Sequence, residues 1–92
     1  MENLSENKDM LLEKATLIEL KPVLSSNICG MGYDADNQLL KVAFRNKTGY
    51  STYLYENVDT ETYNTILKAD SVGKAVSEHI IKQKEKHKYT KL

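Results

Sequence analysis

The run LLKVAF at residues 39–44 constrains the fold of this 92-residue chain more than any other stretch. Leu40, Val42 and Phe44 alternate along it with smaller or more polar side chains. Successive side chains of a β-strand point to opposite faces of a sheet, so the run predicts a strand that buries one face in a core. The other face, which carries Lys41, is expected to meet solvent or a ligand.

Two further strand-like runs flank this one, at residues 26–33 and 50–55. The intervening segments DADNQ and RNKTG contain the Asn, Asp and Gly residues that hairpin turns use. We therefore expect a three-stranded antiparallel meander. Gly30 and Gly32 inside the first run indicate either a β-bulge or the close approach of another backbone.

Helices are expected before and after the meander in the sequence. Residues 5–15 have apolar side chains at helical spacing. Pro22 marks residues 20–24 as an extended connector, because proline fixes φ and lacks an N–H. After the strands, Asp59 is a good N-cap for one helix, and a second helix begins near Ser71.

The helix that begins near Ser71 carries an apolar stripe that must be buried against another surface. His79 falls on this stripe, and we interpret it as a core or interface residue rather than a metal ligand. Together the patterns predict an α+β fold, with a three-stranded antiparallel β-meander, an N-terminal helix and two C-terminal helices. Residues 1–22 would form an N-terminal helical extension and linker, and residues 23–92 the domain proper.

Size and composition limit the classes of protein to consider. A chain of this length forms one small domain, which is often marginally stable alone, so a homo-oligomer is expected. Cys29 is the only cysteine, which excludes an intrachain disulfide and favours a reducing compartment. No apolar run reaches the roughly 18 residues that span a bilayer, and the acidic, polar N-terminus differs from a secretory signal. We expect a cytoplasmic protein without a membrane partner, in the host cytoplasm if the protein is viral.

The net charge of zero conceals a gradient along the chain. Residues 1–20 hold five acidic and two basic side chains, whereas residues 74–92 hold six lysines and two glutamates. A non-specific nucleic-acid binder usually has a broad positive surface, because its affinity comes from counterion release at many phosphates. This chain offers a basic patch at its C-terminus, which is either a phosphate-binding feature or a solvated helix end.

The order of several short motifs resembles the KTSC domain family. The segments that carry the resemblance are LSSNICGMGYD, LLKVAF, Gly49, the triplet Tyr53–Leu54–Tyr55, Val58, Tyr63, Leu67, ADSVG, Ile80 and the terminal KYTKL. They cover roughly residues 23–92. The family occurs at the C-terminus of some lysyl-tRNA synthetases and as stand-alone bacterial and phage proteins, and the resemblance implies a fold and a suggested RNA-binding role.

The segment DSVGK at residues 70–74 is a candidate anion-binding corner. Ser71 can cap the helix, Gly73 permits close backbone approach, and Lys74 adds a charge beside the free N–H groups of the first turn. The GxxxxGK[ST] loop of nucleotide hydrolases is absent from the sequence. The alternative interpretation is an ordinary capped helix with a solvated lysine.

Tyrosine is the main aromatic residue, with six Tyr, one Phe and no Trp. Tyr53 and Tyr55 share one face of their strand, where they either stack on a base or pack beneath the helices. Tyr33 could join either group. Tyr89, in the lysine-rich C-terminal tail with Lys88, is placed to clamp a nucleotide, and Arg45 is a further candidate contact.

No catalytic or metal-binding constellation is recognisable. Catalysis needs a nucleophile with a base, paired carboxylates or a metal cluster, and neither Cys29 nor His87 has an obvious partner. We expect a non-enzymatic protein without cofactor or metal. The candidate ligand-binding residues are Tyr53, Tyr55, Ser71, Gly73, Lys74, Arg45, Lys88 and Tyr89.

Three functions remain open. The first is binding of a small phosphate-bearing ligand, a nucleotide or cyclic nucleotide, with sequestration of a signalling nucleotide in a homo-oligomer, as in a phage anti-defence sponge. The second is an RNA-binding module. The third is a structural or adaptor protein without ligand, in which the acidic N-terminal helix pairs with the basic C-terminus of a neighbour.

Overall fold

A computed structural model describes residues 4–23, 25–83 and 85–92. The first three residues of the N-terminal extension that the sequence predicts therefore lie outside the described part. The elements in chain order are α1 (Leu4–Leu17), β1 (Lys21–Pro22), β2 (Ile28–Asp34), β3 (Leu39–Asn46), β4 (Gly49–Tyr55), α2 (Thr60–Lys68), α3 (Val72–Val76), a π-helical turn η1 (Ser77–Ile81) and β5 (Tyr89–Lys91).

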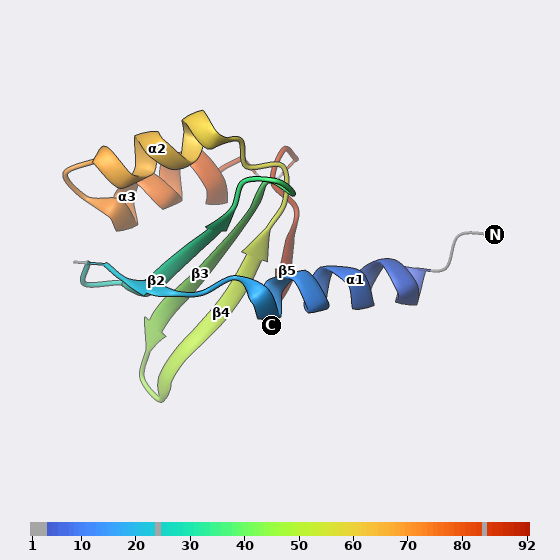
Figure 1. The fold of residues 1–92 in the computed structure, drawn as a ribbon. Helices are drawn as coiled ribbons and strands as arrows, with labels where there is room; N and C mark the ends of the chain where they lie inside the picture. The colour runs from blue at the N-terminus through green and yellow to red at the C-terminus, as the bar shows by residue number, and fades with distance from the viewer. Residues whose placement is uncertain (1–3, 24, 84) are drawn as a thin grey trace.

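The sheet has five antiparallel strands in the order β1-β2-β3-β4-β5, so the α+β class is right but the three-stranded meander is wrong (Figure 1). The two unforeseen strands lie at the edges. β1 is two residues long and contains Pro22, and β5 is a three-residue strand within the lysine-rich segment. Proline and lysine on short strands are the usual features of a sheet edge, but strands this short carry no readable alternation.

The helices α2 and α3 and the turn η1 cover one face of the sheet and form the larger core with it. This face carries Leu40 and Val42 of β3, as the alternation predicted. The helices bury Ile66 and Val76 against these strands. Fully burying aliphatic side chains of this size contributes roughly 1.5 to 3 kcal/mol each.

The predicted stripe on the last helix is only partly right. Val76 and Ile80 are fully buried, but His79 is exposed, so it is not a core residue of the chain. The physical reason is the π-helical turn, which contains more residues per turn than an α-helix. The buried face therefore passes from Val76 to Ile80 and leaves His79 on the solvent side.

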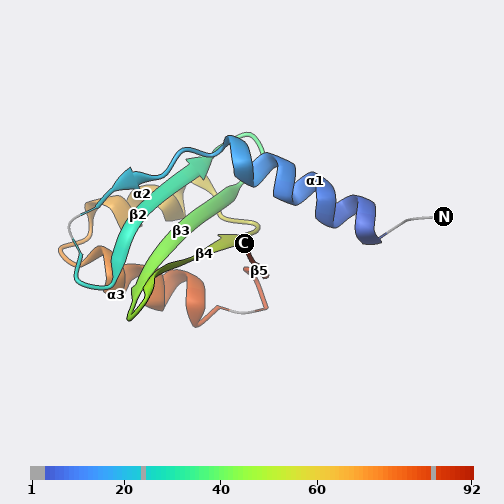
Figure 2. The ribbon, with the colours of Figure 1, turned by 90° about the horizontal axis from the view of Figure 1, so that it is seen from below.

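The C-terminal part of α1 packs on the opposite face of the sheet. A second, smaller core contains Ala15, Ile18, Leu39 and Leu54. Lys41 Nζ donates hydrogen bonds to the carbonyl oxygens of Ala15 and Ile18, at 2.9 and 3.2 Å, and so caps the end of this helix. The rest of α1 extends beyond the sheet (Figure 2).

Gly30 and Gly32 show both features that the sequence indicated. The pairing of β2 with β3 is irregular between Ile28 and Gly30, which is the bulge. At Gly32 the chain that leaves α1 crosses directly over the strand, where a Cβ atom would lie 2.7 Å from Ile18 Cγ2 and closer still to the Glu19 carbonyl oxygen. No helix in the three described segments is long and apolar enough to cross a bilayer.

Candidate functional site

Three tyrosines gather on the helix-covered face of β4 and β5. Tyr55 pairs with Tyr89 across the two strands, and Tyr53 pairs with Lys91. The ring centroids of Tyr53 and Tyr89 lie 5.8 Å apart in an edge-to-face arrangement, and those of Tyr55 and Tyr89 lie 6.3 Å apart. The structure therefore brings together three of the predicted site residues.

These rings line a hollow of about 360 Å³, which we call the tyrosine hollow. Its lining residues are Tyr53, Tyr55, Ile80, Ile81, His87 and Tyr89. Tyr55 is only 6% exposed, whereas Tyr89 is 61% exposed. The hollow thus has a fixed inner ring and an accessible outer ring, an arrangement suited to a flat ligand that stacks against aromatic side chains.

Tyr89 occupies a strand, which corrects its placement in a free tail. The backbone of this segment is also held next to β4, because Glu56 N–H donates to the Lys88 carbonyl oxygen at 2.9 Å. The outer ring of the hollow is therefore positioned by sheet pairing. A positioned ring loses less conformational entropy when a ligand binds than a ring in a mobile tail would.

The tyrosine hollow keeps Tyr55 protonated far above neutral pH. Burial, together with the nearby Tyr53 and Tyr89, raises the pKa of Tyr55 to about 12. Its hydroxyl group can consequently donate or accept a hydrogen bond throughout the physiological range.

His87 also lines the hollow, a position that no sequence pattern predicts. It is 2% exposed, and its Nδ1 lies 3.0 Å from the Glu56 carbonyl oxygen. In the sequence it sits between two lysines, which is typical of a solvated position. His87 is buried because the C-terminal segment pairs with β4, and the local sequence around His87 does not predict this long-range pairing.

Ser71, Gly73 and Lys74 line a different hollow, of about 530 Å³, which shares no residue with the tyrosine hollow. Ser71 Oγ accepts a hydrogen bond from Lys74 N–H at 3.2 Å, as expected of an N-cap. Ser25, Ser26 and Asn27 face these residues across the hollow. Within one chain the tyrosines and this corner do not converge on a common ligand.

The remaining candidate cations, Arg45 and Lys88, are not brought together either. Arg45 is exposed on β3 opposite Tyr50, on the sheet face away from α2 and α3. Lys88 is exposed and directly precedes Tyr89. Of the two, only Lys88 is next to the tyrosine hollow.

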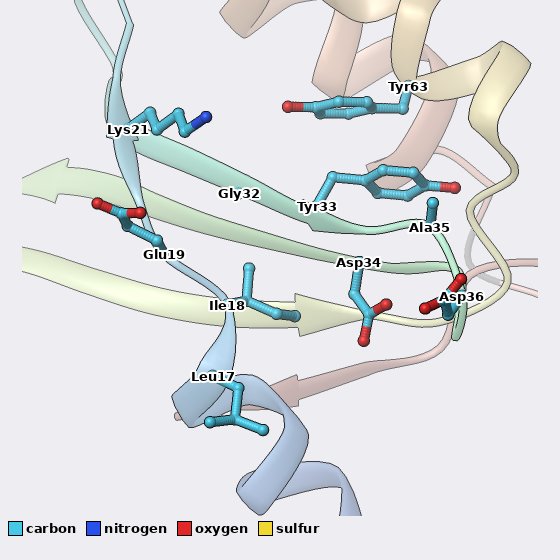
Figure 3. Close-up of a pocket in the computed structure, with 10 residues that line it drawn as sticks. All are labelled: Leu17, Ile18, Glu19, Lys21, Gly32, Tyr33, Asp34, Ala35, Asp36 and Tyr63. Carbon is cyan, nitrogen blue, oxygen red and sulfur yellow. The ribbon is translucent and has the colours of Figure 1, made fainter.

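A third hollow, of about 560 Å³, lies where the chain leaves α1 and passes the C-terminal end of β2 (Figure 3). Tyr33 and Tyr63 stack there with ring centroids 4.3 Å apart, and their hydroxyl groups point in opposite directions. Tyr33 OH donates to the Val58 carbonyl oxygen. Tyr33 thus joins Tyr63, not the tyrosine hollow, and the pair fastens α2 to the sheet.

The Asp34 carboxylate at the edge of this third hollow accepts two hydrogen bonds from Asn37, one from the backbone and one from the side chain. It is therefore a turn former, as the sequence suggested. Within the described ranges, no three His, Cys, Asp or Glu side chains are grouped closely enough to hold a metal ion.

Comparison with known proteins identifies the family. A family model described as the KTSC domain matches residues 24–83. The crystal structure of a KTSC domain protein from Yersinia pestis covers 82% of this chain and 97% of its own, with a TM-score of 0.67 and 32% sequence identity. A protein from Tsukamurella paurometabola is 41% identical over 58 residues, which are 63% of this chain and 82% of that protein. The resemblance found in the sequence is confirmed, and the chain belongs to the KTSC domain family.

Proposed function

We propose that this protein is a non-enzymatic binding protein for a nucleotide or cyclic nucleotide, which it holds in the tyrosine hollow. The observation that supports this proposal is the grouping of Tyr53, Tyr55 and Tyr89 around one open hollow of about 360 Å³. Stacking of a base on such rings contributes roughly 1 to 3 kcal/mol per base. A hollow of this size suits one compact ligand.

Lysines near the hollow are suited to the phosphate. Lys91 lies opposite Tyr53 in the sheet, and side chains of directly paired residues point to the same face. Lys88 precedes Tyr89 in the chain. A net charge of zero favours a ligand with few phosphates, because a long polyanion needs many cations.

Calorimetric titration with mononucleotides and cyclic dinucleotides tests the proposal. Wild-type protein should release or absorb heat with at least one of them, and Tyr89→Ala should weaken that binding about tenfold or more, because a stacking ring is lost. Tyr50→Ala is a matched control, since Tyr50 is 63% exposed, like Tyr89, but lies on the other face of the sheet. Absence of heat with every nucleotide would eliminate the proposed function.

RNA binding is the second candidate, supported by the basic C-terminal segment beside the exposed ring of Tyr89. It predicts a steep decrease of affinity for single-stranded RNA as salt rises. Lys86→Glu with Lys88→Glu should abolish this binding. These substitutions keep β5 in place, whereas deletion of residues 82–92 would also remove a strand of the sheet.

Sequestration of a signalling nucleotide by a homo-oligomer is the biological role we propose for the first function. Mass spectrometry of small molecules released from the purified protein tests the sequestration, and native mass tests the oligomer. An oligomeric mass with no released nucleotide would leave the adaptor role as the better proposal, whereas a single-chain mass would contradict both the homo-oligomer and the adaptor pairing.

A further inference from the structure

His87 is the one polar or charged side chain that is buried among the residues the structure describes. Burying a polar side chain is costly unless its hydrogen-bonding groups find partners. The Nδ1 atom has such a partner, because it lies 3.0 Å from the Glu56 carbonyl oxygen. A carbonyl oxygen only accepts, so Nδ1 must carry the proton of this hydrogen bond.

This arrangement fixes the role of the other ring nitrogen. When Nδ1 of a neutral imidazole is protonated, Nε2 is an acceptor with a free lone pair. Within the described residues, the hydrogen bond at Nδ1 is the only one recorded for this side chain. No side-chain nitrogen or oxygen that is fully buried there lacks a partner. Nε2 must therefore retain some exposure, and the cavity that the ring lines is the tyrosine hollow.

We propose that His87 is a specificity-determining residue of the tyrosine hollow, where Nε2 accepts a hydrogen bond from an N–H group on the edge of a nucleobase. This inference rests on the proposed function and names the part of the ligand that enters. The base would stack on the tyrosines and direct its amino or imino N–H at His87, while ribose and phosphate remain near the mouth with the lysines.

The geometry of the walls supports this orientation. Ile80 and Ile81 contribute apolar surface to the hollow, and Tyr55 is almost fully buried. A phosphate group would lose its hydration against such walls without a buried cation to compensate it, whereas a base loses little. His87 thus offers an acceptor for a base edge inside a mainly apolar and aromatic site.

Two substitutions separate recognition from structure. His87→Asn keeps an amide N–H near the position of Nδ1, where it can still donate to the Glu56 carbonyl oxygen, but has no atom at the position of Nε2. His87→Gln instead reaches the position of Nε2 with an amide group that includes an acceptor. Thermal unfolding measured on both variants shows whether the segment around Glu56 stays folded.

The test uses AMP, GMP, CMP and UMP, each beside an analogue methylated so that its Watson–Crick N–H donors are blocked. With wild-type protein, methylation should weaken binding of the preferred base about tenfold, the loss expected for one hydrogen bond. With His87→Asn the parent nucleotide should bind about tenfold more weakly and methylation should cost little more, whereas His87→Gln should recover part of the affinity.

The possible failures are distinct. If wild-type protein binds neither these four nucleotides nor any cyclic dinucleotide, the proposed function and this inference are both overturned. If it binds one of them, and methylation weakens binding equally in wild-type protein and in folded His87→Asn, the proposed function stands and the role of His87 is rejected.

Discussion

At the scale of single residues, the sequence predicts the contacts that a side chain makes with its own neighbourhood. Asp59 was expected to cap α2, and its carboxylate accepts from Thr62 N–H at 2.8 Å. Hydrogen bonds from Thr62 also lower the pKa of Asp59. His87 and Tyr33 could not be placed in the same way, because their partners are 31 and 25 residues away in the chain.

The close contact between Gly32 and the chain that crosses it predicts how much an added methyl group lowers stability. Gly32→Ala should lower the free energy of unfolding by roughly 1 to 3 kcal/mol or more, since the added methyl group overlaps the crossing chain at Ile18 and Glu19. Gly30→Ala is the control, because its Cβ would meet the Lys21 carbonyl oxygen at a less severe 3.2 Å. Urea denaturation checks both, and equal stabilities of Gly32→Ala and wild-type protein would mean that the chain leaving α1 does not cross β2 here.

The raised pKa of Tyr55 predicts how stability depends on pH. In an unfolded chain tyrosine ionises near pH 10, whereas in the folded protein the pKa of Tyr55 is about 12. The unfolded state therefore loses a proton first, and the free energy of unfolding should fall as pH rises from about 10 to about 12. Below that window Tyr55 is protonated in both states, so it makes no contribution to the pH dependence of stability.

Tyr55→Phe should make this fall shallower in urea denaturation series at pH 8, 10 and 11. Part of the fall in the free energy of unfolding should remain, because burial and, to a smaller extent, the neighbouring Tyr33 also raise the pKa of Tyr63. Identical pH profiles for the variant and wild-type protein would show that Tyr55 is not buried in the hollow.

At the scale of elements, long and patterned segments were predictable and short ones were not. β3 was recognised because eight residues suffice to show alternation. The strands β1 and β5 have two and three residues, and they exist only because an already formed sheet edge lies beside them. The same pairing moves Tyr89 from a presumed tail into the wall of the hollow.

The attachment of α1 is an element-scale feature that one side chain can test. Lys41→Met should lower the free energy of unfolding by about 1.5 to 3 kcal/mol, because a charged donor to the carbonyl oxygens of Ala15 and Ile18 is lost while the apolar stem is kept. Lys47→Met is the control, since Lys47 is exposed in the turn between β3 and β4. The expectation fails if the two variants lose equal stability in the same denaturation experiment.

At the scale of the whole molecule, the sequence predicts candidate ligand-binding residues but not how they are distributed over the fold. Tyr55 and Ser71 belong to different hollows, because the helical segment that follows Ser71 runs along the sheet and separates them. Distances between elements depend on how the elements pack, and the spacing of residues within one element does not predict them. The predicted site therefore divides into two separate groups, the tyrosines of β4 and β5 and the corner at Ser71, Gly73 and Lys74.

The two cores differ in size, and α1 packs on the smaller one. α1 has 14 residues, and helices of about this length are marginal in water without tertiary contacts. Side chains of its last turns reach the smaller core, whereas β3 is paired on both sides and packed on both faces. Amide hydrogen exchange should therefore be fastest in α1 and slowest in β3, because local opening of α1 leaves the larger core intact.

Hydrogen-exchange mass spectrometry at several protein concentrations checks this order of protection. Leu17 is 82% exposed and Met10 is 53% exposed, so a single chain gives these side chains of α1 little cover. If α1 is instead protected as strongly as β3, and the protection grows with concentration together with the native mass, contacts with another copy must hold the helix. Strong protection of α1 that does not depend on concentration would contradict a weak attachment of α1 to the sheet.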